Sequence, residues 1–313
     1  MAQQWIAPEF GDIDVLQLVD VDVAPPRSGE VTIAVRAAGV NPSDAKSLGG
    51  GWNPDPSQLP LRPGQEVAGV VTAVGPGTQI ATGDVAIGDE VIAFKISGGF
   101  ASSVTVPAAD VFAKPAGLDW AAAANLLHVG VVAAELLHLC GAAAGETVLV
   151  HGASGSVGMS VLQQARIAGV RVIGTASVTN QQKVRDAGAE AVVYGDGLAD
   201  RVAELAPDGV HAAIDAAGTA EALAVSMVLV GDALRVATLA PGKAATELGV
   251  HVSAGGKPES IAFRQPARHQ VLELAAAGRL TVPMARTFPL SHAREALALV
   301  SSGHPGGKIA LVP

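Results

Sequence analysis

Three glycines spaced three residues apart form the strongest chemical signal in the sequence. Gly152, Gly155 and Gly158 follow the apolar run 146–151 and open a helix-favouring stretch. The first glycine permits a tight turn, the second lets the backbone approach a pyrophosphate, and the third lets the helix pack against the strand. Such a string alone also fits a structural turn, but the strand before it and the helix after it favour a dinucleotide. The expected site comprises Gly152, Ala153, Ser154, Gly155, Ser156, Val157 and Gly158.

The segment after the next expected strand indicates the type of dinucleotide. An NAD-selective site places an acid about 20 residues after the glycine loop, on the ribose hydroxyls, yet 170–183 contains no acid. Ser177, Asn180 and Lys183 carry donors that suit a 2′-phosphate, so NADPH is favoured over NADH. Lys183 also fits a solvated helix residue. Tyr194, the only tyrosine, fits either a hydroxyl in the same pocket or a core aromatic at a strand end.

The elements that carry these residues alternate between strand and helix from about residue 120 to 254. This alternation predicts an α/β fold with a doubly wound parallel sheet. Before residue 115, short apolar runs separated by Pro and Gly turn signals predict a barrel-like β domain. The chain then gives expected helices over 267–277 and 292–301. A closing strand over 308–312 is expected to return to the first domain.

Composition limits the partners and the compartment. The chain has 313 residues, a length that favours two domains. Its net charge of −9 opposes nucleic acid or an anionic membrane as the main partner. Aromatic residues make up 3% and form no visible stacking platform for single strands. Cys140 is alone, so an internal disulfide and a multi-cysteine zinc site are excluded. No basic region precedes an apolar stretch at the N-terminus, and a cytoplasmic location is expected.

Five motifs in order carry a resemblance to a known family. They are Gly39-Val40-Asn41-Pro42-Ser43-Asp44, Pro63-Gly64-Gln65-Glu66-Val67-Ala68-Gly69, Gly88-Asp89-Glu90-Val91, the glycine loop and Gly303-His304-Pro305-Gly306-Gly307-Lys308. Over nearly its whole length the chain resembles the medium-chain dehydrogenase/reductase superfamily, and within it the zinc-independent quinone oxidoreductase branch. The resemblance implies a GroES-like catalytic domain over 1–120, completed by 255–313, and a Rossmann domain over 121–254. Relatives commonly dimerise, so a homodimer is expected.

Two positions separate this chain from the zinc enzymes of that superfamily. Alcohol dehydrogenases carry Cys where Asn41 stands and His where Gln65 stands. Because an amide is a poor ligand for tetrahedral zinc, no metal is expected. The chemistry that remains is hydride transfer from NADPH to an acceptor that is already electrophilic, a quinone or a conjugated enone. The alternative of another class is a non-enzymatic NADPH-binding protein.

The resemblance also implies further site residues. Asn41 is expected at the nicotinamide end, orienting the carboxamide or the acceptor oxygen, and Asp44 is expected to tie the loop down. Lys46 and Trp52 stand where relatives often carry tyrosines. Lys46 fits either a stabiliser of an anionic oxygen or a surface lysine, and Trp52 fits either a wall for a planar acceptor or a cover of the barrel mouth. The remaining cofactor contacts carried over by position are Ala217, Gly218, Leu239, Ala240 and Phe263, the last of which also fits a domain-interface core residue.

Overall fold

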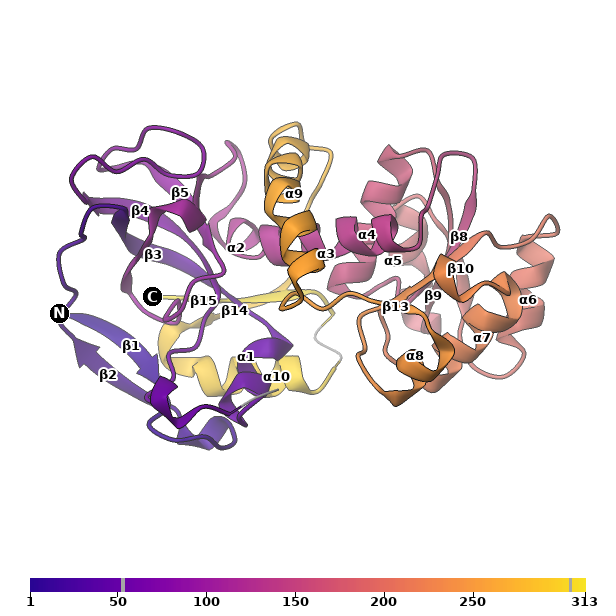
Figure 1. Cartoon of the computed structure of the whole chain (residues 1–313), viewed down its shortest axis with the longest axis horizontal. Coiled ribbons are helices and arrows are strands. Elements are labelled where there is room, and N and C mark those ends of the chain that lie inside the picture. Colours follow the sequence, from indigo (N-terminus) through magenta and orange to yellow (C-terminus); the bar gives the residue numbers. More distant parts are fainter. Residues whose placement is uncertain (52–53, 304–305) are drawn as a thin grey trace. The chain divides into compact units, whose positions relative to one another are not determined.

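The computed structural model describes residues 1–51, 54–303 and 306–313. It divides into two compact units, residues 1–128 with 282–313 and residues 129–281 (Figure 1). The expected division placed 255–281 with the first domain, whereas this segment belongs to the second unit. Its packing explains the difference, because the side chain of Val271 lies against Gly130, at 2.5 Å from where a Cβ would stand.

The first unit is built on an antiparallel sheet that the end of the chain completes. Its strand order is β14-β15-β3-β4-β5-β7, with β6 pairing β3, and β1 and β2 pair separately. The yellow C-terminal strand β15 lies antiparallel beside β3, with Ile309 opposite Val40, as the sequence predicted for the closing strand (Figure 1). The strands are β1 (Ala2–Ile6), β2 (Gln17–Val21), β3 (Glu30–Val40), β4 (Glu66–Val74), β5 (Glu90–Phe94), β6 (Ser103–Pro107), β7 (Val111–Ala113), β14 (Met284–Pro289) and β15 (Lys308–Val312).

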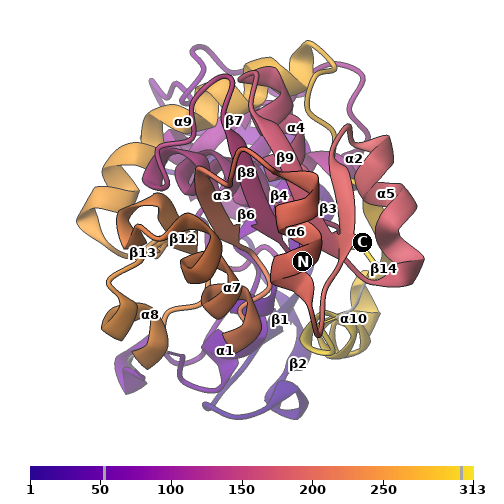
Figure 2. The same ribbon diagram turned by 90° about the vertical axis from the view of Figure 1, so that its right-hand side faces the viewer.

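The second unit contains the predicted parallel sheet. Its strand order is β10-β9-β8-β11-β12-β13, and all neighbouring strands are parallel. Figure 2 labels β8, β9, β12 and β13 of this sheet. Numbered from β8, this is the 3-2-1-4-5-6 order of a Rossmann fold, in which ligands bind at the carboxyl ends of the strands where the order reverses. The strands are β8 (Thr147–His151), β9 (Arg171–Ala176), β10 (Glu190–Val193), β11 (Ala212–Asp215), β12 (Val236–Thr238) and β13 (His251–Val252).

Both units contain helices, and those of the second unit alternate with its strands as the sequence predicted. In the first unit these are α1 (Pro42–Leu48), α2 (Trp120–Ala123) and α10 (Ala293–Ser301). Helix α3 (Leu126–Leu139) begins in the first unit and continues into the second. The second unit adds α4 (Ser156–Ile167), α5 (Gln181–Asp186), α6 (Leu198–Leu205), α7 (Ala220–Val230), α8 (Lys243–Leu248) and α9 (Pro258–Ala276).

Three local expectations were wrong. The first 115 residues are not purely β, because Pro42 at the first turn and Asp44 behind it start the short helix α1. The helix-favouring composition of 121–139 predicts one continuous helix, but the helix is interrupted at Asn125, whose Nδ2 donates to the carbonyl of Ala121 at 2.9 Å. Helix α9 begins nine residues before the expected start, since Pro266 is accommodated inside it.

Candidate active site

The glycine loop has the geometry that an anion site needs. Gly152 has φ +68°, in the left-handed region, and its N–H donates to Thr175 Oγ1 at 3.2 Å. A Cβ on Gly158 would stand 2.3 Å from the carbonyl oxygen of Gly152, so only glycine lets α4 come this close to the loop. Gly155 caps α4 without a side-chain hydrogen bond. The first N–H groups of α4 are therefore available to a pyrophosphate.

The residues predicted to bind the 2′-phosphate follow the neighbouring strand. β9 pairs β8 in parallel, so Ser177 lies one residue beyond β9 at the same edge of the sheet as the glycine loop. Asn180 is exposed and Lys183 lies on α5. Partial burial lowers the pKa of Lys183 from its ordinary value. No acid lies between the end of β9 and Lys183. The 2′-phosphate-binding role of these residues stays a prediction.

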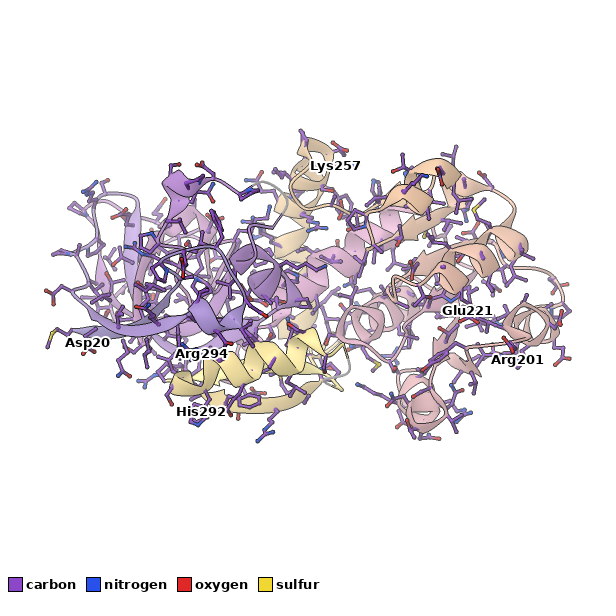
Figure 3. All side chains as sticks on the ribbon, turned by 90° about the horizontal axis from the view of Figure 1, so that it is seen from below. Asp20, Arg201, Glu221, Lys257, His292 and Arg294 are labelled. Atoms are coloured by element: carbon purple, nitrogen blue, oxygen red, sulfur yellow. The ribbon has the colours of Figure 1, made fainter. Side chains whose placement is uncertain are left out.

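Tyr194 directly follows β10, the edge strand beside β9. Half of the residue is exposed, at 50%, so it is not the core aromatic of the alternative interpretation. The turn after it is held from two helices: Arg201 on α6 donates to the carbonyl of Gly195 at 3.0 Å, and Glu221 on α7 accepts from its N–H at 2.9 Å. Figure 3 labels both side chains. Tyr194 thus stays accessible beside a fixed turn.

Asp215, a residue that the sequence analysis did not assign, organises the next two loops. Its Oδ1 accepts from the N–H groups of Ala217 at 2.9 Å and Gly218 at 2.8 Å, and its Oδ2 accepts from Thr238 Oγ1 at 2.8 Å. Thr238 Oγ1 in turn accepts from the N–H of Ala240 at 3.0 Å. The predicted contacts at 217–218 and 239–240 therefore share one carboxylate as their support. The sequence signal that could have identified Asp215 is an acidic residue at the end of a buried strand.

Phe263, one of the expected cofactor contacts, packs against a histidine ring. It lies within α9 and stacks on His138 of α3, with ring centroids 4.5 Å apart and planes at 15°. Both rings belong to the second unit. Its side chain packs within this unit.

His151, the last residue of β8, is buried beside the glycine loop. It is 2% exposed, and among the described residues its Nε2 has no hydrogen-bond partner. Burial lowers the pKa of His151 to about 4, which the charge of Asp215 opposes. The imidazole is therefore neutral at pH 7.

This burial predicts a loss of stability in weak acid. The unfolded chain takes up a proton near pH 6.5 whereas the folded protein does so only near pH 4, so stability is lost as the pH falls through this window. Between pH 7 and pH 5 we expect the unfolding free energy to drop by about 2 kcal/mol more in the wild type than in His151→Leu. Urea unfolding at both pH values measures this, with His292→Gln as the exposed control. Equal slopes in the wild type and His151→Leu would contradict the assignment.

In the first unit, Asn41 lies among buried charges. Its Nδ2 donates to Glu66 Oε1 at 2.9 Å, and its Oδ1 accepts from Lys308 Nζ at 2.5 Å. Lys308 Nζ and Glu66 Oε1 are 3.4 Å apart. The register brings the three together, because Asn41 follows β3 while Glu66 and Lys308 begin the adjacent strands β4 and β15. The sequence motifs contained Glu66 and Lys308, but no role was assigned to either.

Asp44 ties the loop down, as expected. Its two oxygens accept from the N–H groups of Asn41 at 2.8 Å and Gly64 at 3.3 Å. Burial raises the pKa of Asp44 to about 7, and the charge of Glu66 acts in the same direction. Next to it, Gln65 Nε2 donates to Ser43 Oγ at 3.2 Å. Asp44 thus links the two motifs that contain the family's zinc positions.

The sequence predicted that no metal is bound, and it offered Lys46 and Trp52 as residues near the acceptor. Among the described residues, no group of three or more His, Cys, Asp or Glu side chains could hold a metal ion. Lys46 lies exposed on α1, and Trp52 lies outside the described residues. A cavity of about 590 Å³ opens within the first unit, where Leu48, Leu59 and Ile96 contribute apolar walls beside Asp44 and Gln65.

Two family models match parts of the chain on either side of the glycine loop. The alcohol dehydrogenase GroES-like domain matches residues 27–116, and the zinc-binding dehydrogenase model matches residues 187–311. A Rossmann sheet with this glycine loop, together with a GroES-like barrel, defines the class. The chain belongs to the medium-chain dehydrogenase/reductase superfamily.

Individual relatives refine this placement. Rat quinone oxidoreductase is 38% identical over 179 residues, 56% of this chain and 53% of the relative. The mouse synaptic vesicle membrane protein VAT-1 homolog is 35% identical over 215 residues, 67% of this chain and 52% of the relative. The chain thus spans about half the length of these curated relatives. A mycobacterial protein solved in complex with NADPH is 28% identical over 100% of both chains, with a TM-score of 0.82. In the part of this chain that the structure describes, no helix is long and apolar enough to cross a membrane.

Proposed function

We propose that the protein is an NADPH-dependent, zinc-independent reductase that transfers hydride to quinones. The observation that carries the proposal is the occupation of the family's two zinc positions by amides engaged in hydrogen bonds. Asn41 is held by Glu66 and Lys308, and Gln65 donates to Ser43. Neither offers the thiolate or imidazole that catalytic zinc requires. We infer that the acceptor must be electrophilic enough to take a hydride without activation by a metal ion.

The balanced reaction is NADPH + H⁺ + quinone → NADP⁺ + hydroquinone. NADPH supplies the hydride, and the residues of this chain bind and orient. The loop 152–158 and the N-terminus of α4 support the pyrophosphate. The cavity beside Asp44 and Gln65 is the place we propose for the acceptor, because its mixed apolar and polar lining suits a planar ring that carries carbonyl oxygens. Its nearness to the motifs 39–44 and 63–69 supports this placement.

Steady-state turnover tests the proposal directly. NADPH and NADH are each offered with a simple 1,4-quinone and with a conjugated enone, in the presence of a metal chelator. We expect chelator-resistant turnover of the quinone with NADPH preferred. Chelator-sensitive turnover would contradict the metal-free assignment. Turnover of the enone alone would replace the acceptor class, and tight NADPH binding without turnover would favour a non-enzymatic role.

Lys183 is proposed to select NADPH through the 2′-phosphate. A charge-assisted hydrogen bond to phosphate is lost in Lys183→Ala, so we expect KM for NADPH to rise about tenfold while KM for NADH stays unchanged. Arg185→Ala is the matched control, since Arg185 is an exposed cation on the same helix. An equal rise for both cofactors in Lys183→Ala would show that this lysine does not select between them.

The assembly and location of the protein are proposed by analogy with the family. We propose a homodimer and a cytoplasmic location. Sedimentation of the purified protein with and without NADPH tests the first.

A further inference from the structure

Lys308 and Glu66 form a buried pair of opposite charges that the proposed reaction does not yet use. The exposed fractions are 5% for Lys308 and 0% for Glu66. Charges removed from water in this way are costly unless each is paired and hydrogen-bonded. Each of the two charges also contacts one shared neighbour in addition to its partner.

The neighbour that both charges contact is the side-chain amide of Asn41. The ammonium of Lys308 donates to its oxygen, and the carboxylate of Glu66 accepts from its nitrogen. A flipped amide would turn its N–H groups toward the ammonium and its oxygen toward the carboxylate, and both contacts would become repulsive. The orientation of the amide is thus set by electrostatics. An amide between groups of one charge would have no such preference.

Glu66 is anchored independently of Asn41. Its second oxygen accepts from the backbone N–H of His128, in the first turn of α3, at 3.3 Å. A carboxylate at a helix N-terminus is favoured by the helix dipole. Gly39 makes room for the carboxylate, because a Cβ there would stand 2.7 Å from Glu66 Oε1. The carboxylate is therefore a rigid reference for the amide.

The two contacts leave the amide with one N–H of Nδ2 beyond the bond to Glu66. We propose that Lys308 and Glu66 are positioning residues that lock the amide of Asn41 so that this second N–H donates to a carbonyl oxygen of the bound reactants. That oxygen belongs either to the acceptor or to the nicotinamide carboxamide. This inference depends on the proposed reductase function. It makes Asn41 a donor in the site and explains why an asparagine, with both an acceptor and a donor end, fits between these two charges.

The double variant Glu66→Gln/Lys308→Met separates positioning from folding. It removes both charges of the pair together and keeps similar side-chain volumes, so neither partner is left as an unpaired buried charge. We expect an unfolding midpoint close to that of the wild type but a fall in kcat/KM of at least about tenfold, the effect of losing one oriented hydrogen bond. An unchanged NADPH Kd with a lower kcat assigns the oxygen to the acceptor, and a raised NADPH Kd assigns it to the cofactor. Wild-type values of both quantities in a folded double variant would overturn the proposal.

Asn41→Ala provides a second route if the double variant does not fold. It keeps the charge pair intact and should by itself lower kcat/KM at least about tenfold, the effect of losing one oriented hydrogen bond. Where the double variant folds, combining the three changes should cause no further loss. Lys308→Arg retains a buried cation with hydrogen-bond donors, so this variant should keep most of the wild-type activity. Lys114→Met is the control for loss of a lysine ion pair in the same unit, since Lys114 and Glu90 lie 2.8 Å apart, and it should leave turnover unchanged. Wild-type kinetics in Asn41→Ala would refute the role of the amide.

A measurement without turnover tests the lock itself. Hydrogen exchange of the Asn41 side-chain amide, followed by NMR in the ¹⁵N-labelled protein, should be at least about tenfold faster in the double variant than in the wild type, because a buried hydrogen bond to a charged group is lost. Equal exchange would contradict the lock. If the wild type reduces no quinone, the proposed function fails, while the exchange rate and the NADPH Kd still decide whether the pair positions Asn41.

Discussion

Gly158→Ala should weaken cofactor binding strongly. The added Cβ would stand 2.3 Å from the carbonyl oxygen of Gly152 and 2.7 Å from Cα of Ala153. Both are backbone atoms, so the loop or the N-terminus of α4 must move away. Overpacking of this kind costs about 1–3 kcal/mol of stability. Because the same backbone groups are the ones proposed to bind the pyrophosphate, we expect the Kd for NADPH to rise about 100-fold.

Fluorescence titration of NADPH measures this effect, and urea unfolding measures the accompanying loss of stability. Gly242→Ala is the matched control in the same unit: its φ is 177° and no atom lies within 4 Å of the place its Cβ would take, so both quantities should stay at the wild-type values. A Gly158→Ala protein that binds NADPH normally would refute the assignment of the loop.

Removing one member of the Lys308–Glu66 pair should destabilise the protein more than removing both. Lys308→Met leaves the carboxylate of Glu66 buried without its cation, and breaking a buried pair in this way costs about 3–5 kcal/mol. Burial already raises the pKa of Glu66, opposed by Lys308, and the loss of Lys308 raises it further. The folded variant then holds a proton that the unfolded chain releases above about pH 4.5, so the destabilisation grows as the pH rises.

Urea unfolding of the wild type, both single variants and the double variant at pH 5 and pH 8 tests this expectation. We expect Lys308→Met to be less stable relative to the wild type at pH 8 than at pH 5, and the double variant to recover most of the loss at pH 8. Equal destabilisation at both pH values, or additive losses in the double variant, would contradict a coupled buried pair.

The geometry of the glycine loop was predictable because its signal is local. Gly152, Gly155 and Gly158 act on a strand, a turn and a helix that are contiguous in the chain, and the structure places them as expected. The residues after each parallel strand also follow from strand order alone, since the carboxyl ends share one edge of the sheet. Asp215 escaped notice because its partners come from two loops.

Helix boundaries were less predictable where tertiary contacts override local preference. Pro266 would be expected to end a helix, since it lacks an N–H and crowds the preceding turn. In the structure α9 continues through it from Pro258 to Ala276. Its buried face carries Arg264, which donates to Glu135 of α3 at 2.6 Å, and these contacts favour the longer helix.

The sequence by itself determined the fold class, the family and the nucleotide loop, because each depends on residue types at short and regular spacing. The tertiary structure alone decided the surroundings of Asn41. Glu66 lies 25 positions from it and Lys308 lies 267, and only the pairing of β3 with β4 and β15 brings the three side chains into contact. Buried charges interact strongly only when they lie within a few ångströms of each other, and the separation of two residues along the chain does not reveal that distance.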